Sequence, residues 1–292
     1  YEGYPQLQHS LQEIVRHRLT AVQRFAGRLA SGEYEARMNS AQRDEIGELA
    51  RSMDILAQRL FEARSRDERL REQQSAFFAT ISHELKTPVT VIRGSLEALR
   101  DGVVSGGDDV RAYYNQMLTE CKGLQRLIID LLELSRLQNA DFSLNMGSVD
   151  VRELLGDVAM SAGALCSRKG VRFDCREPGN KLQIVGDYAR LRQMLLVVLD
   201  NAVKFTPEGK RVSLALEGKT IVIADEGIGI PAEELAHIFD RFRRTRRSNE
   251  QGTGLGLAIC SEVARRHGIA IDVASRVGEG TTFRFTFPDG GS

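Results

Sequence analysis

The stretch Ser82-His83-Glu84-Leu85-Lys86-Thr87-Pro88 places a histidine and an adjacent carboxylate inside a sequence of helical periodicity. Apolar residues recur on both sides at spacings of three and four, which predicts the seam of a coiled coil or helical bundle. His83 comes two residues after the seam residue Ile81, about 200° around the helix, and therefore faces outward. Because an imidazole titrates near neutrality, a histidine held on a helix beside a carboxylate is a candidate nucleophile or proton shuttle, although an ordinary surface histidine is commoner. The seam residues are Phe77, Ile81, Leu85, Val89, Ile92, Leu96, Leu99 and Val103.

Three glycine-bearing segments lie far downstream of this helix. Asp225-Glu226-Gly227-Ile228-Gly229-Ile230 follows an apolar strand, Gly252-Thr253-Gly254-Leu255-Gly256-Leu257 opens an amphipathic stretch, and Gly278-Glu279-Gly280-Thr281-Thr282 precedes an alternating strand. A fourth segment, Asp200-Asn201-Ala202-Val203-Lys204-Phe205, closes a predicted helix. Glycine lets the backbone approach a ligand closely, and a helix N-terminus offers unpaired N–H groups to phosphate. One such segment is usually a tight turn, whereas four in this order behind a histidine helix form a specific pattern.

This pattern resembles the sensor histidine kinases of bacterial two-component signalling, over about residues 75–288. The resemblance implies a multidomain protein. A dimeric α-helical coiled coil and four-helix bundle would carry His83 and precede an α+β two-layer sandwich. That sandwich would be the ATP-binding fold shared by histidine kinases, gyrase, Hsp90 and MutL.

The element pattern agrees with this architecture. Helical stretches at 151–168 and 187–204 alternate with short strands, and long helices mixed with mostly antiparallel strands predict an α+β sandwich. The predicted strands are 171–175, 182–185, 211–216, 220–224, 270–275 and 281–287.

The phosphoacceptor region is predicted to be a helical hairpin. One helix would run from Asp44 into the His83 region, with a local break at Pro88, where proline removes a hydrogen bond. A glycine-rich turn at residues 101–109 would lead to a return helix, leaving one open apolar face that a second copy covers. The seam of the return helix is Tyr114, Met117, Cys121, Leu124, Ile128, Leu131 and Ser135.

The N-terminal region resembles a HAMP domain, a parallel four-helix relay made by a dimer. A helix at 6–30 is followed by a polar connector to about Arg43, and Asp44 is a natural N-cap for the next helix. The proline usual near the start of the first helix is absent, since Arg18 stands about there. A solvated amphipathic hairpin without a relay role is the alternative.

Four regions follow from these patterns: a helical lead-in at 1–15, a HAMP-like relay at 16–70, a dimerisation and phosphotransfer hairpin at 71–140, and a catalytic ATP-binding domain at 148–288.

The amino-acid composition limits which classes of partner and which cellular setting the chain can have. Forty basic residues balance forty acidic ones, which gives no electrostatic case for nucleic acid. The four cysteines are scattered, as expected of reduced thiols rather than a disulfide frame or zinc site. The chain has no run of 18 apolar residues and begins at Tyr1 without methionine. We therefore expect the cytoplasmic portion of a bacterial inner-membrane protein whose membrane segment lies upstream.

The resemblance assigns roles to three residues of the histidine helix. His83 matches the histidine that attacks the γ-phosphate of ATP, and Glu84 matches the acid that takes the proton from the other ring nitrogen. Thr87 matches the position that orients water when the bundle dephosphorylates its response regulator. A plain ion pair between Glu84 and Lys86 is the alternative for the carboxylate.

The resemblance also assigns the adenine pocket. Asp225 matches the carboxylate that accepts a hydrogen bond from the adenine amine, which would discriminate against guanine. Gly227 and Gly229 would let the base approach closely, and Thr281 matches the threonine that backs adenine through water.

Phosphate and metal residues are carried over in the same way. Asn201 matches the asparagine that ligates Mg²⁺, and Lys204, one turn later, would reach the phosphates. The family usually carries a second asparagine where this chain has Val197, which predicts looser metal or phosphate geometry. Arg244 stands where the family places an arginine near the γ-phosphate.

The resemblance implies a polar, mobile lid at residues 246–250 that ends at Gly252. The segment Gly252-Thr253-Gly254-Leu255-Gly256 would then cradle phosphate at a helix N-terminus, with Gly252, Gly254 and Gly256 permitting the approach. ATP and Mg²⁺ are thus the expected cofactors.

The predicted function is a homodimeric sensor histidine kinase that autophosphorylates His83 and passes the phosphoryl group to an aspartate of a response regulator receiver domain, with phosphatase activity at the same bundle. A dimeric signalling scaffold without autokinase activity is the first alternative, which Val197 favours. A free ATPase related to gyrase or MutL is the second, and the phosphoacceptor helix argues against it.

Overall fold

The computed structural model describes residues 4–39, 44–139, 142–176, 182–243 and 252–288. These fall into two compact units, residues 1–81 and 82–292. Among the described helices, none combines the length and the apolar character that a membrane span needs.

The first unit contains α1 (Tyr4–Ala30) and the first part of α2 (Glu45–Arg100). Its core is formed by Phe25, Leu29 and Ala57. Phe25 and Leu29 of α1 are buried, whereas the neighbouring Ala26 is half-buried.

Carboxylates fix the connector of this unit. Asp44 caps α2 by accepting the N–H of Gly47 at 2.8 Å, as the sequence predicts, and it pairs with Arg18. Asp54 accepts the N–H groups of Met38 at 2.7 Å and Asn39 at 3.1 Å, so the end of the connector is held against α2.

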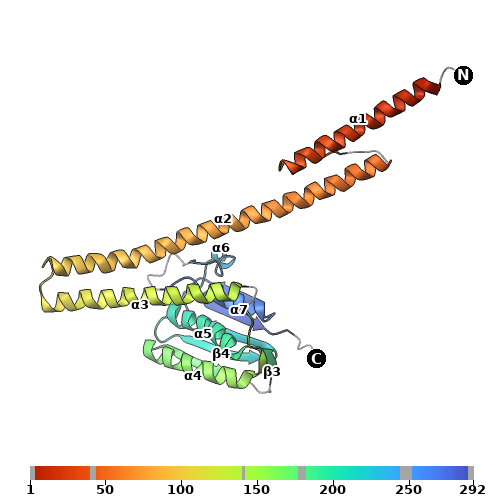
Figure 1. Ribbon diagram of the computed structural model, residues 1–292. Coiled ribbons are helices and arrows are strands. Elements are labelled where there is room, and N and C mark those ends of the chain that lie inside the picture. Colours follow the sequence, from red (N-terminus) through yellow and green to blue (C-terminus); the bar gives the residue numbers. More distant parts are fainter. Residues whose placement is uncertain (1–3, 40–43, 140–141, 177–181, 244–251, 289–292) are drawn as a thin grey trace. The chain divides into compact units, whose positions relative to one another are not determined.

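The second helix is continuous. α2 runs through Pro88, so the local break predicted there does not end the helix. A proline costs the helix one hydrogen bond, and the long helical turns on both sides outweigh that loss. α3 (Gly107–Gln138) then returns in the opposite direction, beginning inside the predicted turn (Figure 1).

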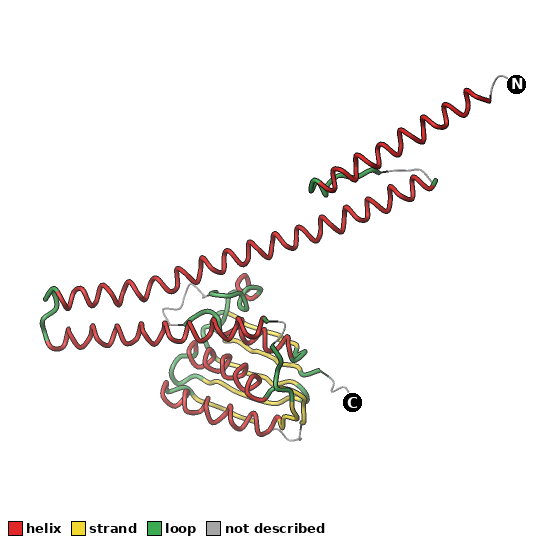
Figure 2. The backbone as a smooth tube through the Cα atoms, in the orientation of Figure 1, coloured by secondary structure: helices red, strands yellow, loops and turns green. Residues whose placement is uncertain are grey.

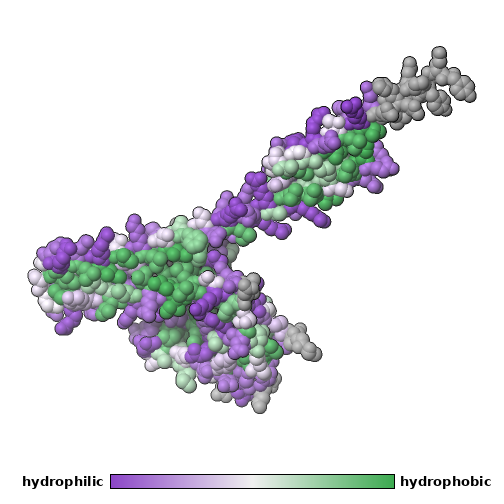
Figure 3. All heavy atoms as spheres, viewed as in Figure 1, coloured by the Kyte–Doolittle hydropathy of each residue, from purple (hydrophilic) through white to green (hydrophobic). Residues whose placement is uncertain are grey.

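The hairpin of α3 and the end of α2 leaves an apolar stripe exposed, which Figure 3 shows along its length. Several predicted seam residues are about half exposed in the single chain, among them Leu96, Tyr114 and Ile128. The buried residues of α3 include Leu127, Leu134 and Leu137, which lie on a different face. α3 therefore has two apolar faces, of which the sequence pattern predicted one.

The C-terminal part of the second unit is built on a five-stranded sheet of order β2-β4-β5-β7-β6 (Figure 2). The pairing of β2 with β4 is parallel and the others are antiparallel, as expected. A second, two-stranded sheet pairs β3 with β1, a strand of four residues that the sequence analysis missed. The strands are β1 (Gly147–Asp150), β2 (Arg172–Arg176), β3 (Gln183–Gly186), β4 (Arg211–Glu217), β5 (Thr220–Asp225), β6 (Ala270–Arg276) and β7 (Gly280–Thr286).

Three helices cover one face of the large sheet and make the second layer (Figure 1). They are α4 (Val151–Lys169), α5 (Tyr188–Phe205) and α7 (Gly256–Arg266), and a short α6 (Ala232–Leu235) follows β5. Asp150 and Asp187 cap α4 and α5 by accepting backbone N–H groups. Fully buried Leu195, Leu199 and Phe285 lie in the core between the layers, so α5 is anchored at the centre.

Candidate functional site: a nucleotide pocket

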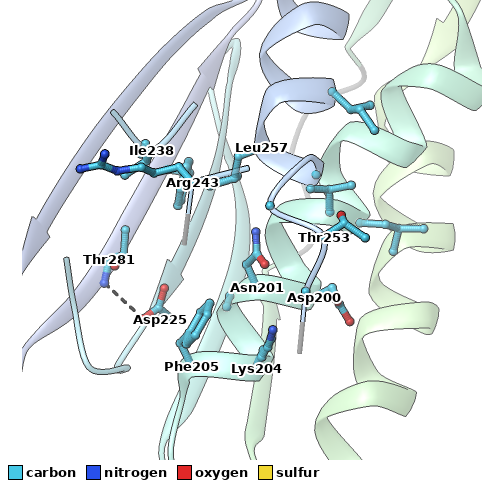
Figure 4. Close-up of a pocket in the computed structure, with 18 of the residues that line it drawn as sticks. Asp200, Asn201, Lys204, Phe205, Asp225, Ile238, Arg243, Thr253, Leu257 and Thr281 are labelled. Carbon is cyan, nitrogen blue, oxygen red and sulfur yellow. Dashed lines mark hydrogen bonds between the residues drawn. The ribbon is translucent and has the colours of Figure 1, made fainter. Parts of the chain in front are cut away.

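A pocket of about 490 Å³ lies where α5, the end of β5, the N-terminus of α7 and β7 meet, with α3 at its side (Figure 4). This volume is in the range of small-molecule and cofactor sites. The predicted nucleotide residues that line it are Asn201, Lys204, Asp225, Gly229, Gly252, Gly254, Gly256 and Thr281.

Asp225 is the half-buried acid of the pocket. It ends β5, where the sheet register pairs it with Thr281 of β7. Its Oδ1 accepts the N–H of Gly227 at 2.8 Å and that of Thr281 at 3.2 Å, and Figure 4 marks the second bond. Burial raises the pKa of Asp225 to about 6, against which these two hydrogen bonds act. The two hydrogen bonds therefore fix the carboxylate in position, and its desolvation makes the ionised form less favourable.

The glycines beside Asp225 are required by the backbone. Gly229 has φ +68°, and a Cβ there would lie 2.0 Å from the carbonyl oxygen of Arg276. A Cβ at Gly227 would lie 2.6 Å from Oδ1 of Asp225. Side chains at either position would displace the carboxylate or the neighbouring loop.

The last turn of α5 supplies the polar wall. Asn201 and Lys204 lie one turn apart on the same helix, and both side chains are drawn in the pocket in Figure 4. A Cβ added to Gly252 would lie 3.1 Å from the Lys204 ammonium, so this cation stands beside the second glycine segment. A nearby cation and an amide oxygen suit an anionic, metal-bridged ligand.

The second glycine segment leads into α7. Gly254 has φ +69°, and a Cβ there would lie 2.8 Å from the backbone of Phe242. Oγ1 of Thr253 accepts the N–H of Leu255 at 3.3 Å. Gly256 begins α7 and lines the pocket, so the N-terminus of this helix is directed at the ligand space. Arg244 lies outside the described residues.

Val197 also lines the pocket, one turn before Asn201. Its Cγ1 would lie 3.0 Å from a Cβ at Gly256, so the apolar side chain fills the space beside the start of α7. The expected second amide is thus replaced by a packing contact.

The three residues of the histidine helix lie together on α2. The His83 side chain is 80% exposed, and its Nδ1 is 3.9 Å from Oε1 of Glu84. Oγ1 of Thr87 donates to the carbonyl oxygen of His83 at 3.2 Å, which places Thr87 one turn further along. None of the three is among the described residues that line the nucleotide pocket.

Sequence reasoning missed part of the pocket. Ile228, Ile230 and Ile238 give it an apolar wall suited to a flat heterocycle, and two of them were quoted only as spacers of a glycine segment. Arg126 and Asp130 of α3 also line it. The isoleucines could have been predicted from the glycine segment itself, whereas no local signal marks the two α3 residues.

A half-buried carboxylate beside an apolar slot, together with a lysine, an asparagine and a glycine-framed helix N-terminus, is the arrangement of a nucleotide-binding domain. Family descriptions agree with this class. "Histidine kinase-, DNA gyrase B-, and HSP90-like ATPase" matches residues 186–291, "His Kinase A (phospho-acceptor) domain" matches residues 73–140, and "HAMP domain" matches residues 15–62. The chain belongs to the sensor histidine kinase family.

Relatives and solved structures place it in the same family. Sensor histidine kinase YclK of Bacillus subtilis is 30% identical over 286 residues, which are 93% of this chain and 58% of YclK. Full-length ShkA, solved in complex with AMPPNP, is 30% identical with a TM-score of 0.51, and the match covers 72% of this chain and 45% of ShkA. Histidine kinase ThkA, solved in complex with response regulator protein TrrA, shares the fold at 23% identity and a TM-score of 0.62, covering 79% of this chain and 66% of ThkA.

Proposed function

We propose that this chain is an ATP-dependent protein-histidine kinase that phosphorylates His83 and then transfers the phosphoryl group to an aspartate of a response regulator. The observation that carries the proposal is the pocket itself, in which half-buried Asp225 lines the same space as Lys204 and the N-terminus of α7. The chain spans 58% of the length of YclK. Regions of a full-length protein that lie outside this chain would therefore also contribute to its activity.

In the first step, a ring nitrogen of His83 attacks the γ-phosphorus of ATP. The N–P bond forms, the bond to the bridging oxygen breaks, and ADP leaves with that electron pair. Since Nδ1 is the ring nitrogen near Glu84, Nε2 is the attacking atom and Glu84 takes the proton from Nδ1 as charge develops on the ring. The exposure of His83 leaves room for the nucleotide to approach.

In the pocket, Asp225 accepts a hydrogen bond from the adenine amine, and a guanine would present a carbonyl oxygen there instead. Gly227 and Gly229 let the backbone pack closely behind the carboxylate, since a Cβ at either position would meet Asp225 or the backbone of Arg276. Thr281 supports the base edge, since its backbone holds Asp225 and its hydroxyl lies 2.9 Å from Oγ of Ser275.

Phosphate binding is assigned to Lys204, the N-terminus of α7 and the glycines at 252, 254 and 256, together with Arg244. The side-chain oxygen of Asn201 would hold Mg²⁺, because an amide oxygen is a hard ligand of the kind that this ion prefers. Lys204 lines the same pocket and would contact the phosphates. When bound, the metal supplies charge neutralisation for the phosphates, and one protein ligand is enough because Mg²⁺ takes most of its ligands from phosphate and water.

The assembly proposed is a homodimer, anchored to a bacterial membrane through a segment outside this chain. The exposed apolar stripe of the hairpin and the exposed seam residues Leu49 and Leu56 of the first unit support a second copy as the cover. The HAMP match supports the membrane connection, and the complex of ThkA with TrrA supports a receiver domain as partner. Phosphatase activity toward that receiver is part of the proposal.

The test of the proposed function is incubation of the purified chain with Mg²⁺ and γ-³²P-ATP. We expect a label on the protein that acid removes and base preserves, as a phosphohistidine requires. A chain that binds ATP but acquires no such label would instead be a dimeric signalling scaffold without autokinase activity.

Replacing Thr87 by alanine should separate the two activities. Autophosphorylation should stay near the wild-type rate, because the hydroxyl of Thr87 is one turn from the imidazole and bonds only the His83 carbonyl in the described structure. Dephosphorylation of a receiver domain that the wild-type protein phosphorylates should slow by about tenfold or more, the low end of what a positioned polar group contributes. Autophosphorylation is followed by the gain of radiolabel on the chain, and dephosphorylation by the loss of radiolabel from the receiver domain.

Thr90→Ala is the matched control, since Oγ1 of Thr90 makes the same kind of bond to the Lys86 carbonyl at 2.9 Å. It should change neither rate. Equal losses of both activities in Thr87→Ala would mark the residue as structural.

A further inference from the structure

One carboxylate of the phosphoacceptor hairpin reaches the nucleotide pocket. Oδ2 of Asp130, on α3, accepts a hydrogen bond from Oγ1 of Thr253 at 2.6 Å. The two residues are 123 positions apart, and both line the pocket. Burial raises the pKa of Asp130, while its bond to Thr253 and the charge of Arg126 oppose that rise. The group is thus partly desolvated at the point of contact.

This contact falls on the part of the pocket assigned to phosphate. Thr253 stands between Gly252, beside which the Lys204 ammonium lies, and Gly254. A negative charge on α3 therefore shares the cationic end of the pocket with any anion that enters. Arg126 also lines the pocket, but its side chain is exposed, so water screens its charge more effectively.

Other contacts hold the ATP-binding domain against the same end of α3. Glu133, one turn after Asp130, pairs with Arg190 and accepts the side-chain amide of Gln193, both from α5. Arg266 of α7 donates to the carbonyl oxygens of Asn139 and Phe142, each at 2.7 Å.

The ring of Phe142 adds to this docking. The guanidinium carbon of Arg190 lies 5.7 Å from its centroid and that of Arg266 lies 5.6 Å from it. Together with buried Leu134 and Leu137 of α3, these contacts make a specific docked state rather than a loose collision.

We propose that Asp130 is a built-in competitor of the nucleotide phosphates: it holds the phosphate-binding segment through Thr253 while the ATP-binding domain is docked on α3, so docking and binding of a phosphorylated nucleotide oppose each other. The inference rests on the proposed function, because it takes the pocket to be the ATP site. By linkage, a nucleotide that binds the undocked state more tightly shifts the population toward it, which frees the domain to move toward His83.

The test is calorimetry on the full chain with Mg²⁺, using AMPPNP and, separately, adenosine as probes. Asp130→Asn keeps an oxygen acceptor for Thr253 and removes the charge, so it is expected to bind AMPPNP about tenfold more tightly, with the gain shrinking at high salt. Adenosine, which carries no phosphate, should bind both proteins equally. Asp108→Asn, the same change on an exposed residue in the first turn of α3, should bind both probes as the wild type does.

A second variant tests docking apart from charge in the pocket. Glu133 lies outside the described pocket lining, and Glu133→Gln weakens its pairing with Arg190. It should tighten AMPPNP binding by a few-fold. Unchanged AMPPNP affinity in either Asp130→Asn or Glu133→Gln overturns the inference, whereas a wild-type chain that binds neither probe overturns the proposed function instead.

Discussion

Replacing His83 by glutamine is expected to reduce the acid-labile phosphoryl label to background while nucleotide affinity stays within a few-fold of wild type. The reason is spatial separation. His83 is an exposed residue of α2 and is not among the described residues lining the pocket, so its loss removes the nucleophile and leaves the ATP site intact. Gel autoradiography after incubation with labelled ATP measures the first quantity, and calorimetry with AMPPNP measures the second.

His17→Gln is the matched control for this change. It is the same substitution at an exposed histidine of α1, and it should retain the full label. An acid-labile label that persists in His83→Gln would move the phosphoacceptor to another residue and sink the assignment.

Replacing Asp225 by asparagine is expected to weaken AMPPNP binding by about 1–3 kcal/mol, the cost of losing a partly desolvated charged acceptor and presenting a donor in its place. Asparagine is nearly isosteric, and its oxygen can still accept the N–H groups of Gly227 and Thr281. The fold should therefore survive, which circular dichroism checks. An unchanged affinity would mean that adenine binds elsewhere.

The pH dependence of binding gives an independent signature of the same carboxylate. The pKa of Asp225 is raised to about 6, so this group gains its proton as pH falls through 6. Because the adenine amine is a donor, it favours the ionised carboxylate, and the affinity of the wild type should decline over this interval. Asp225→Asn should lack that component, while titration of the nucleotide phosphates is common to both proteins and cancels in the comparison.

Local patterns explain why much of the fold could be predicted. The apolar run of β5 and the helical period of α5 put the ends of these elements within one or two residues of the predicted positions. The glycines that follow Asp225 could be recognised in the sequence because the backbone at these positions tolerates no Cβ. The structure thus brings most of the predicted nucleotide residues to one pocket, and their individual roles stay predictions.

Contacts between distant segments explain what the sequence did not reveal. Strand β1 has four residues and a partner 33 to 39 positions further on, so its alternation is too short to recognise. In the sequence, Asp130 follows an apolar helical stripe and looks like an ordinary surface acid. Only the packing of α7 beside α3 shows that it contacts the pocket.

The two apolar faces of α3 limit how its sequence can change. Leu127, Leu134 and Leu137 are committed to the interior of the chain, while neighbouring positions such as Ile128 and Leu132 remain exposed on another side. Only a narrow stripe of the helix is then tolerant of substitution. If the gene were duplicated, the two copies of this helix would diverge through paired, compensating substitutions. A copy that came to prefer a different dimer partner through one face would have to keep the contacts of the other face with the ATP-binding domain.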